Sequence, residues 1–188
     1  MGLWPGSRRW ECVRAAGLPN FGKGWLSTLA RSHSRFKIAA MKFEKVHTIR
    51  DLYDGVRSGT ADLNGSPHYF ACPFDDAADD YADHFLLYPV SPQFMERELQ
   101  HWAIYRAWED KFHRGLLPLE THPGHGGVNA DFDELSRWLD GQINSLACVT
   151  KQRATFQAVQ GQDDLPAGIL RELEVNWSAM SDLGRNSP

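Results

Sequence analysis

Three polar side chains that could do chemistry interrupt the apolar sector of one long predicted helix: Glu98, His101 and Glu109. Glu98 and His101 have the Glu-x-x-His spacing that metal sites in helical bundles use. Such sites need a second copy on another helix, and Asp110 with His113 only approximates one. The spacing therefore favours a partly buried histidine and glutamate satisfied by hydrogen bonds, with a small-ligand pocket or a metal site as alternatives.

Two histidines, His122 and His125, lie in the segment HPGHGG ahead of a second predicted helix. Imidazoles separated by two residues can share a metal ion, and a glycine-rich turn lets backbone N–H groups converge at a helix N-terminus. Two histidines supply only half of a metal site, and the cysteines are not nearby in the sequence. The segment is therefore either a flexible connector or the metal-binding loop of a metal-assisted hydrolase.

A third candidate is Arg57, in the glycine-flanked segment YDGVRSG at residues 53–59. Its planar guanidinium suits a carboxylate or a phosphate, and Asp54 or Asp51 could hold it in position. If this turn lies at the mouth of a groove under the long helix, Arg57 would anchor an anionic ligand. The alternative is an Arg–Asp pair that only fixes the turn.

The residues proposed to surround such a ligand come from the turn, the following hairpin and the long helix. We expect the tyrosines of this set to give flat contacts to the ligand. The predicted ligand-binding residues are Tyr53, Asp54, Arg57, His68, Tyr69, His101 and Glu109.

Other catalytic patterns do not appear in the sequence. There is no Ser/His/Asp order, Walker loop or Gly-x-Gly-x-x-Gly element, and Cys12, Cys72 and Cys148 have no metal or redox spacing. The aspartate-rich segment 75–83 lacks the alternation and glycine of an EF-hand loop, which favours a solvated hairpin loop. The sequence therefore assigns no catalytic residue and no cofactor, and it leaves open whether the protein is an enzyme.

Charge is distributed unevenly along the 188 residues. Residues 1–40 carry seven Lys/Arg and one acid, a net of +6, and the remainder carries a net of −10, which together give the overall −4. An acidic body repels a phosphate backbone, so we expect no nucleic-acid partner. No apolar run approaches the length of about 20 residues that a membrane span needs. The few unpaired cysteines indicate a reducing compartment, and we expect a cytoplasmic protein without a membrane partner.

The change in composition at Met41 predicts the domain organisation. Residues 1–40 show no sustained period and no apolar segment typical of a secretory signal. We expect them to be an extension outside the domain, with Met41 as the true start; a transit peptide and a functional basic arm are the alternatives. Residues 41–178 are predicted to form one domain, and 179–188 a polar tail.

Two helices and about five strands are predicted within that domain. Ser91 is a suitable N-cap, Pro92 a suitable first residue and Gly115 a suitable left-handed end, which predicts a helix over 92–114. Asn129 similarly begins a second helix, with a single apolar stripe. Asn64–Gly65 is a strong hairpin signal. A short strand or turn is expected within 46–57, and strands at 58–63, 68–72, 84–88, from 153 to about 158 and at 173–177.

The order βββ-αα-ββ predicts an α+β fold. Short hairpin connections favour antiparallel pairing, and segregated helices favour a sheet with its helices on one side. We therefore expect an antiparallel sheet of about five strands covered on one face by two helices.

Several of these segments also carry a resemblance. YDGVRSG, NGSPHYF, FLLYPVS and HWAIYRAWEDKF resemble segments of a family of small, uncharacterised bacterial proteins, a domain of unknown function, over about 41–178. The resemblance implies a bacterial protein but no catalytic residues. Members often have proline after the Asp–Gly turn, where this chain has Val56.

The hypothesis that follows is a non-catalytic binding or interaction module of the bacterial cytoplasm. A small anionic ligand or a protein is the expected partner. The alternative hypothesis is a metal-assisted hydrolase that uses the His122 and His125 loop.

Overall fold

The computed structural model describes residues 42–52 and 54–180. The predicted extension at 1–40, Tyr53 and most of the predicted tail lie outside these described residues. Among the helices that the structure describes, none combines the length and the apolar character needed to cross a membrane.

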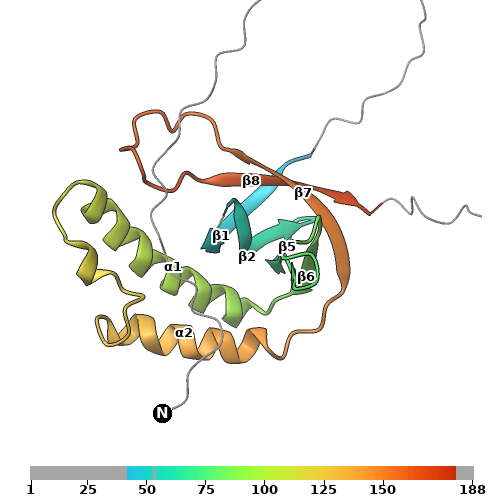
Figure 1. The fold of residues 1–188 in the computed structure, drawn as a ribbon, viewed down its shortest axis with the longest axis horizontal. Helices are drawn as coiled ribbons and strands as arrows, with labels where there is room; N and C mark the ends of the chain where they lie inside the picture. Colours follow the sequence, from blue (N-terminus) through green and yellow to red (C-terminus); the bar gives the residue numbers. More distant parts are fainter. Residues whose placement is uncertain (1–41, 53, 181–188) are drawn as a thin grey trace, which may run out of the picture. The chain divides into compact units, whose positions relative to one another are not determined.

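The main feature of the fold is a closed antiparallel barrel with the strand order β1-β2-β3-β6-β7-β8 (Figure 1). The barrel strands are β1 (Glu44–Leu52), β2 (Val56–Leu63), β3 (Ser66–Ala71), β6 (Phe85–Pro89), β7 (Thr150–Ala158) and β8 (Leu173–Ala179). A separate two-residue ladder joins β4 (Phe74–Asp75) to β5 (Asp80–Tyr81) inside the aspartate-rich segment. Two helices, α1 (Pro92–His113) and α2 (Ala130–Ile143), lie between β6 and β7.

The closed barrel corrects the predicted fold, because an open sheet of about five strands is wrong. The segment expected to be a short strand or turn is the nine-residue strand β1, which pairs with both β2 and β8. β1 also carries register shifts against β2 between Val46 and Thr48 and between Ile49 and Leu52. Bulges of this kind increase strand twist, which helps a sheet to curl until its first and last strands meet.

The pairing that closes the barrel is short. β1 and β8 are in register only at Glu44 with Val175 and Lys45 with Glu174. Beyond Lys45, β1 continues to Leu52 as the partner of β2 alone within the described residues. The two strands therefore form a seam that is closed at one end and open at the other.

Large apolar side chains fill the barrel. Phe70 and Leu87 are fully buried on neighbouring strands, and the rings of Phe85, Phe156 and Trp177 lie within 5.6 to 6.1 Å of one another. Alternation along each strand directs these residues inward, as in other filled small barrels. The fully buried Val175 continues this core to the seam.

Both helices begin where their sequences predict, and α1 also ends at the predicted glycine. The Ser91 hydroxyl accepts a hydrogen bond from the Phe94 amide at 3.1 Å, and the Asn129 side chain accepts one from Phe132 at 2.9 Å. Gly115, directly after the C-cap of α1, has a φ of 72°. A short 3-10 helix, η1 (Leu119–Thr121), lies in the connection to α2.

The helices pack against the outside of the barrel. Tyr69 from β3, Phe94 from α1 and Leu139 from α2 are buried together in this second layer. Trp102, from the middle of α1, instead packs against the cluster that fills the barrel. α1 therefore joins the outer layer to the core, and Trp102 brings it close to the seam.

Candidate binding groove

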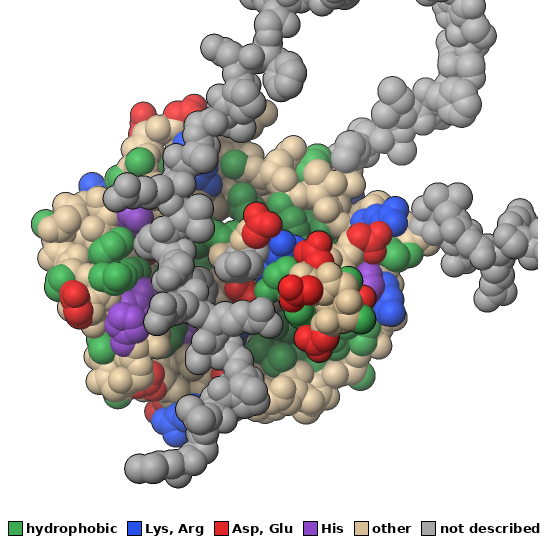
Figure 2. Space-filling model, viewed as in Figure 1, with side chains coloured by type: hydrophobic (Ala, Val, Ile, Leu, Met, Phe, Trp, Pro, Cys, Tyr) green, Lys and Arg blue, Asp and Glu red, His purple; other side chains and the backbone are tan. Residues whose placement is uncertain are grey.

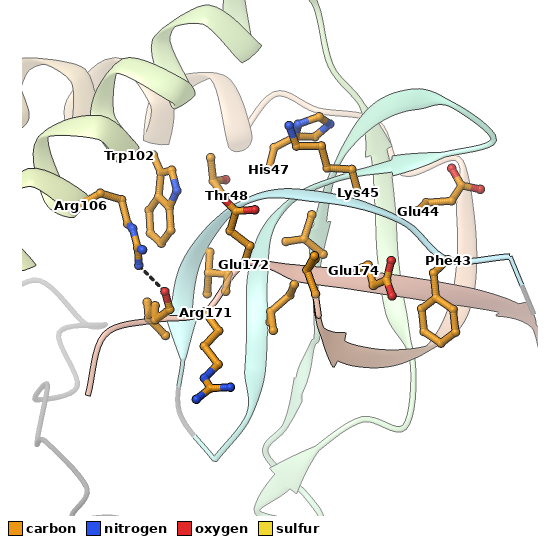
Figure 3. A pocket seen from close by; sticks show the side chains of 15 residues that line it. Phe43, Glu44, Lys45, His47, Thr48, Trp102, Arg106, Arg171, Glu172 and Glu174 are labelled. Atoms are coloured by element: carbon orange, nitrogen blue, oxygen red, sulfur yellow. Dashed lines mark hydrogen bonds between the residues drawn. The ribbon is translucent and has the colours of Figure 1, made fainter. Parts of the chain in front are cut away.

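A groove of about 440 Å³ lies beside the seam (Figure 3). One wall is the first half of β1, another is α1, and the third is the chain leading into β8. Its lining comprises Phe43–Ile49, Trp102, Arg106, Val159 and Leu170–Glu174. The volume falls within the range of about 300 to 1,000 Å³ typical of small-molecule sites.

The groove forms because the segment that precedes β8 does not pair with β1 and instead contacts α1. The Leu170 amide donates to Glu109 Oε1 at 3.0 Å, and the Leu170 carbonyl accepts from Arg106 Nη1 at 2.7 Å. Gly168 supports the docking, because its φ is +94° and a Cβ there would overlap the His113 ring. The space vacated between β1 and Leu170 becomes the groove.

Arg106 is held in place before any ligand arrives. Its guanidinium donates to the carboxylate of Glu109, which is 2% exposed. It also lies 5.7 Å from the Trp102 ring centroid. A buried carboxylate of this kind needs its charged partner and its hydrogen bonds, so it fixes the arginine geometry. Arg106 and Trp102 thus offer a positioned cation beside a flat apolar ring.

Charged side chains of both signs line the groove. In Figure 3, Arg106 lies beside Trp102, and Arg171 extends away from that ring at the same end of the groove, whereas Glu44 and Glu174 lie toward the opposite end with Phe43. Glu44 accepts hydrogen bonds from the Asn64 and Gly65 amides at 3.0 and 2.9 Å, which fixes its carboxylate at the β2–β3 turn. Lys45, paired with Glu174 across the seam, and Glu172, next to Arg171, also line the groove, so charges of both signs occur along its length.

His47 adds a hydrogen-bonded imidazole to the lining. Its Nε2 lies 2.9 Å from Asp62 Oδ1, and both side chains are less than one quarter exposed. A carboxylate at Nε2 orients the imidazole ring. His47 lies at the bulged part of β1, where alternation along the strand is interrupted.

A buried ionic network under α1 fixes this helix relative to β1. The Glu98 side chain is 1% exposed and accepts hydrogen bonds from Arg50 and Thr48, each at 2.9 Å. Arg50 also donates to Asp140 of α2 at 2.8 Å, and Thr48 lies 2.8 Å from Thr60. Because Glu98 and Trp102 are on the same helix, the network also positions the wall of the groove.

His101 belongs to the interface between the helices. Its Nε2 lies 2.9 Å from Ser136 Oγ, and its ring stacks on Phe132 with centroids 3.9 Å apart. Burial and, to a smaller extent, the charge of Arg50 together lower the pKa of His101 from 6.5 to about 4. A histidine with this pKa is a poor general base near neutral pH. The Ser–His pair therefore supports packing of the two helices rather than nucleophilic catalysis.

We predict that His101 makes stability depend on pH. The folded-state pKa of about 4 lies below the ordinary value of 6.5, so the unfolded chain binds the proton first as the pH falls. Its contribution is complete above pH 6.5 and is lost as the pH decreases toward 4. Urea unfolding across this window should show a flatter pH profile for His101→Gln than for the wild type.

The exposed His125 provides the control for this measurement. His125→Gln should keep nearly all of the wild-type slope, because that imidazole is exposed and its effect on the pKa of His122 is secondary to burial. Equal slopes for wild type and His101→Gln would contradict a buried, neutral His101.

Arg57 lies elsewhere, at the β4–β5 hairpin. Its guanidinium is 4.0 Å from the Tyr81 ring centroid, and Nη2 donates to the Asp54 carbonyl at 2.8 Å. Burial raises the pKa of the nearby Asp51, and the charge of Arg57 opposes this effect. On the face shown in Figure 2, acidic side chains gather over the region of β5 and β6. Arg57 therefore lies among aspartates, and it does not line the groove at the seam.

The remaining predicted ligand-binding residues are spread over other positions. His68 lies toward the Asn64–Gly65 turn, with Nδ1 2.8 Å from the Ser66 carbonyl. Tyr69 is buried under the helices with Phe94. Of the predicted set, Glu109 comes nearest to the groove, since it holds Arg106 and Leu170. The members of the predicted set within residues 54–180 are not gathered around one cavity.

His122 and His125 lie close together beyond the end of α1. Their ring centroids are 5.4 Å apart, and His122 Nδ1 accepts from the Gly124 amide at 2.9 Å. Burial lowers the pKa of His122, and the neighbouring His125 adds to this effect. No group of three or more His, Cys, Asp or Glu side chains suited to a metal occurs among residues 42–52 and 54–180. Metal-assisted hydrolysis at this pair stays a prediction, without a third ligand in that part of the chain.

The residues that line the groove were missed by sequence reasoning. Trp102 and Arg106 stand one helical turn apart on α1, a spacing that places both on one face. The sequence shows this spacing, but it does not indicate which strand packs beside that face of the helix. No sequence pattern pointed to Lys45, His47 or Arg171. They come together only through the pairing of β1 with β8, which are far apart in the sequence.

Comparison with known proteins assigns no relative to this chain. No family model matches it, and neither curated proteins nor solved structures give a significant match. The resemblance to a family of small bacterial proteins therefore stays a prediction.

Proposed function

We propose that this protein is a non-catalytic binding module whose ligand occupies the groove at the β1–β8 seam. The ligand carries an anionic group that pairs with Arg106 and Arg171, and an apolar or flat part that contacts Trp102. The observation that supports this most is the fixed arginine beside the open strand edge: Arg106 is held by Glu109 and by the Leu170 carbonyl.

The chemistry of the groove favours binding over catalysis. A catalytic site needs a reactive group close to a partner that tunes it. The groove offers charges, an aromatic ring and backbone amides, and the Thr48 hydroxyl in its lining is already engaged by Glu98 and Thr60. A binding site needs only a few well-placed polar groups in a largely apolar concavity.

We predict that Arg171→Ala weakens ligand binding without weakening the fold. Arg171 is about half exposed, and its nearest acidic partner is Asp163 at 3.8 Å, so its loss costs little stability. A panel of small aromatic carboxylates and phosphates, such as indole-3-acetate and phenyl phosphate, can be screened by saturation-transfer NMR. Compounds that bind the wild type should bind Arg171→Ala about tenfold or more weakly, with an unchanged melting temperature.

Arg137→Ala is the matched control, since Arg137 is an exposed arginine on α2 away from the groove. It should bind as the wild type does. The proposal fails if no anion in the panel binds, or if Arg171→Ala and Arg137→Ala bind equally well. If binding is lost in Arg57→Ala and not in Arg171→Ala, the ligand binds at the turn formed by residues 54–59.

A further inference from the structure

The indole N–H of Trp102 is a hydrogen-bond donor without a partner in the described part of the chain. Trp108 and Trp177 differ from it, because their N–H groups donate to Thr121 Oγ1 at 3.0 Å and to the Asp62 carbonyl at 2.8 Å. Among residues 42–52 and 54–180, no buried side-chain nitrogen or oxygen lacks a hydrogen-bond partner, so the Trp102 nitrogen reaches solvent. Trp102 lines the groove, which gives a ligand access to this donor.

Arg106 also keeps hydrogen-bond donors for a ligand. Its interactions with the Glu109 carboxylate and the Leu170 carbonyl both use Nη1. The N–H groups of Nη2 and Nε remain, and they have no hydrogen-bond partner among the residues that the structure describes. The contacts that fix Arg106 therefore leave another edge of its guanidinium open.

The donors of Trp102 and Arg106 are close enough to bind one group. Both residues lie on one face of α1, one helical turn apart, and the guanidinium carbon is 5.7 Å from the Trp102 ring centroid. In Figure 3 the Trp102 ring lies between the Arg106 side chain and Thr48 of β1. Tyr105 stacks on this ring with centroids 5.3 Å apart and 23° between the planes, which holds its orientation. A carboxylate or a phosphate beside the ring edge could therefore accept hydrogen bonds from both side chains.

Hydrogen-bond direction selects the ligand more sharply here than the charge of the lining does. Lys45 and Glu172 both line the groove, so its charges alone favour neither sign strongly. An N–H group, in contrast, is satisfied only by an acceptor, and a bound ligand that leaves it covered and unpaired loses affinity. The Trp102 edge therefore favours a ligand with an oxygen acceptor at that position.

We propose that the Trp102 N–H donates a hydrogen bond to the oxyanion of the ligand, which Arg106 binds through Nη2 or Nε. Trp102 is then a specificity-determining residue, and the ligand class is a carboxylate or a phosphate monoester attached to an apolar group. This inference rests on the proposed function, since it assigns a further ligand contact in the same groove.

The indole N–H signals of the wild-type full chain test this contact directly. During titration with phenyl phosphate or indole-3-acetate, the Trp102 indole proton should move downfield and exchange more slowly with water, because it becomes hydrogen-bonded. Trp138 on α2 is the internal control. Its N–H also has no partner among the described residues, but it does not line the groove, so its signal should stay unchanged.

Trp102→Phe removes the donor and keeps an aromatic ring against Tyr105. It should weaken binding of both anions by about tenfold, as expected for loss of a hydrogen bond to a charged group. Trp138→Phe is the matched variant and should bind as the wild type does.

Two results would overturn the inference while leaving the proposed function intact. One is an unchanged Trp102 indole signal on addition of an anion whose binding is weakened by Arg171→Ala. The other is equal binding of such an anion by the wild type and Trp102→Phe. The wild-type spectra decide alone if Trp102→Phe does not fold. If neither anion binds, the proposed function fails together with the inference.

Discussion

Glu98→Gln is expected to lower the free energy of unfolding by about 3 to 5 kcal/mol, which is the cost of breaking a buried ion pair by changing one partner. The carboxylate is almost fully buried and accepts from Arg50 and Thr48. Its neutral replacement leaves the Arg50 charge, which is only 15% exposed, with Asp140 alone. Urea unfolding at neutral pH measures this loss directly.

Glu96→Gln is the control, because Glu96 is an exposed glutamate two residues earlier on the same helix. It should change stability by less than about 0.5 kcal/mol. The double variant Arg50→Met with Glu98→Met should recover part of the loss, since apolar pairs of similar volume can replace buried ion pairs. A loss below about 1 kcal/mol for Glu98→Gln would show that the network does not hold α1 on the barrel.

Trp108→Ala is expected to cost about 3 to 5 kcal/mol, as truncation of buried aromatic side chains does. Trp108 is 9% exposed, and its ring stacks on Phe112 with centroids 4.9 Å apart. Its indole N–H donates to Thr121 Oγ1 at 3.0 Å, which ties the connection after α1 to the helix. Thermal and urea unfolding should both report the loss.

Leu99→Ala tests whether the loss is specific to burial, because Leu99 is an α1 residue that is 45% exposed. It should cost much less than Trp108→Ala. Trp108→Phe should also cost less, since it keeps an aromatic ring against Phe112 while it removes the N–H donor. A loss near zero for Trp108→Ala with an intact fold would instead assign this side chain to a binding surface.

Local sequence signals predicted the elements of this fold well. Asn64 and Gly65 have φ values of 56° and 76°, the left-handed conformations that the hairpin signal requires. Ser91 and Asn129 cap the helices that follow them. These predictions depend on interactions between residues a few positions apart, which a single sequence displays directly.

Closure of the barrel and formation of the groove could not be predicted in this way. The closing pair of Glu44 with Val175 joins the first and last strands of the described domain. Whether a sheet stays open or closes depends on strand twist and bulges, and neither has a specific residue pattern in β1. The groove depends in turn on where β1 and β8 separate, so Arg106 and Arg171 could not be recognised as neighbours.

Burial and hydrogen bonding of polar residues on the long helix could be predicted from the sequence, whereas a ligand-binding role for any of them stays a prediction. The expectation of a buried, hydrogen-bonded His101 and Glu109 matches their contacts with Ser136, Arg106 and Leu170. An arginine anchor for an anionic ligand was assigned to Arg57, whereas the groove at the seam carries its own arginines. A glycine-flanked turn is easy to recognise in a sequence. A cavity forms where packed strands and helices separate, and that depends on the tertiary structure.

The location of bound ligand is the most direct test of the groove. Backbone amide chemical shifts of the full chain should be followed by NMR during titration with an aromatic anion that binds. The largest changes should occur at Val46 to Ile49, at Leu170 to Glu174 and at the Trp102 indole. Changes concentrated instead at Arg57 and Tyr81, or at His122 and His125, would contradict a binding site at the seam between β1 and β8.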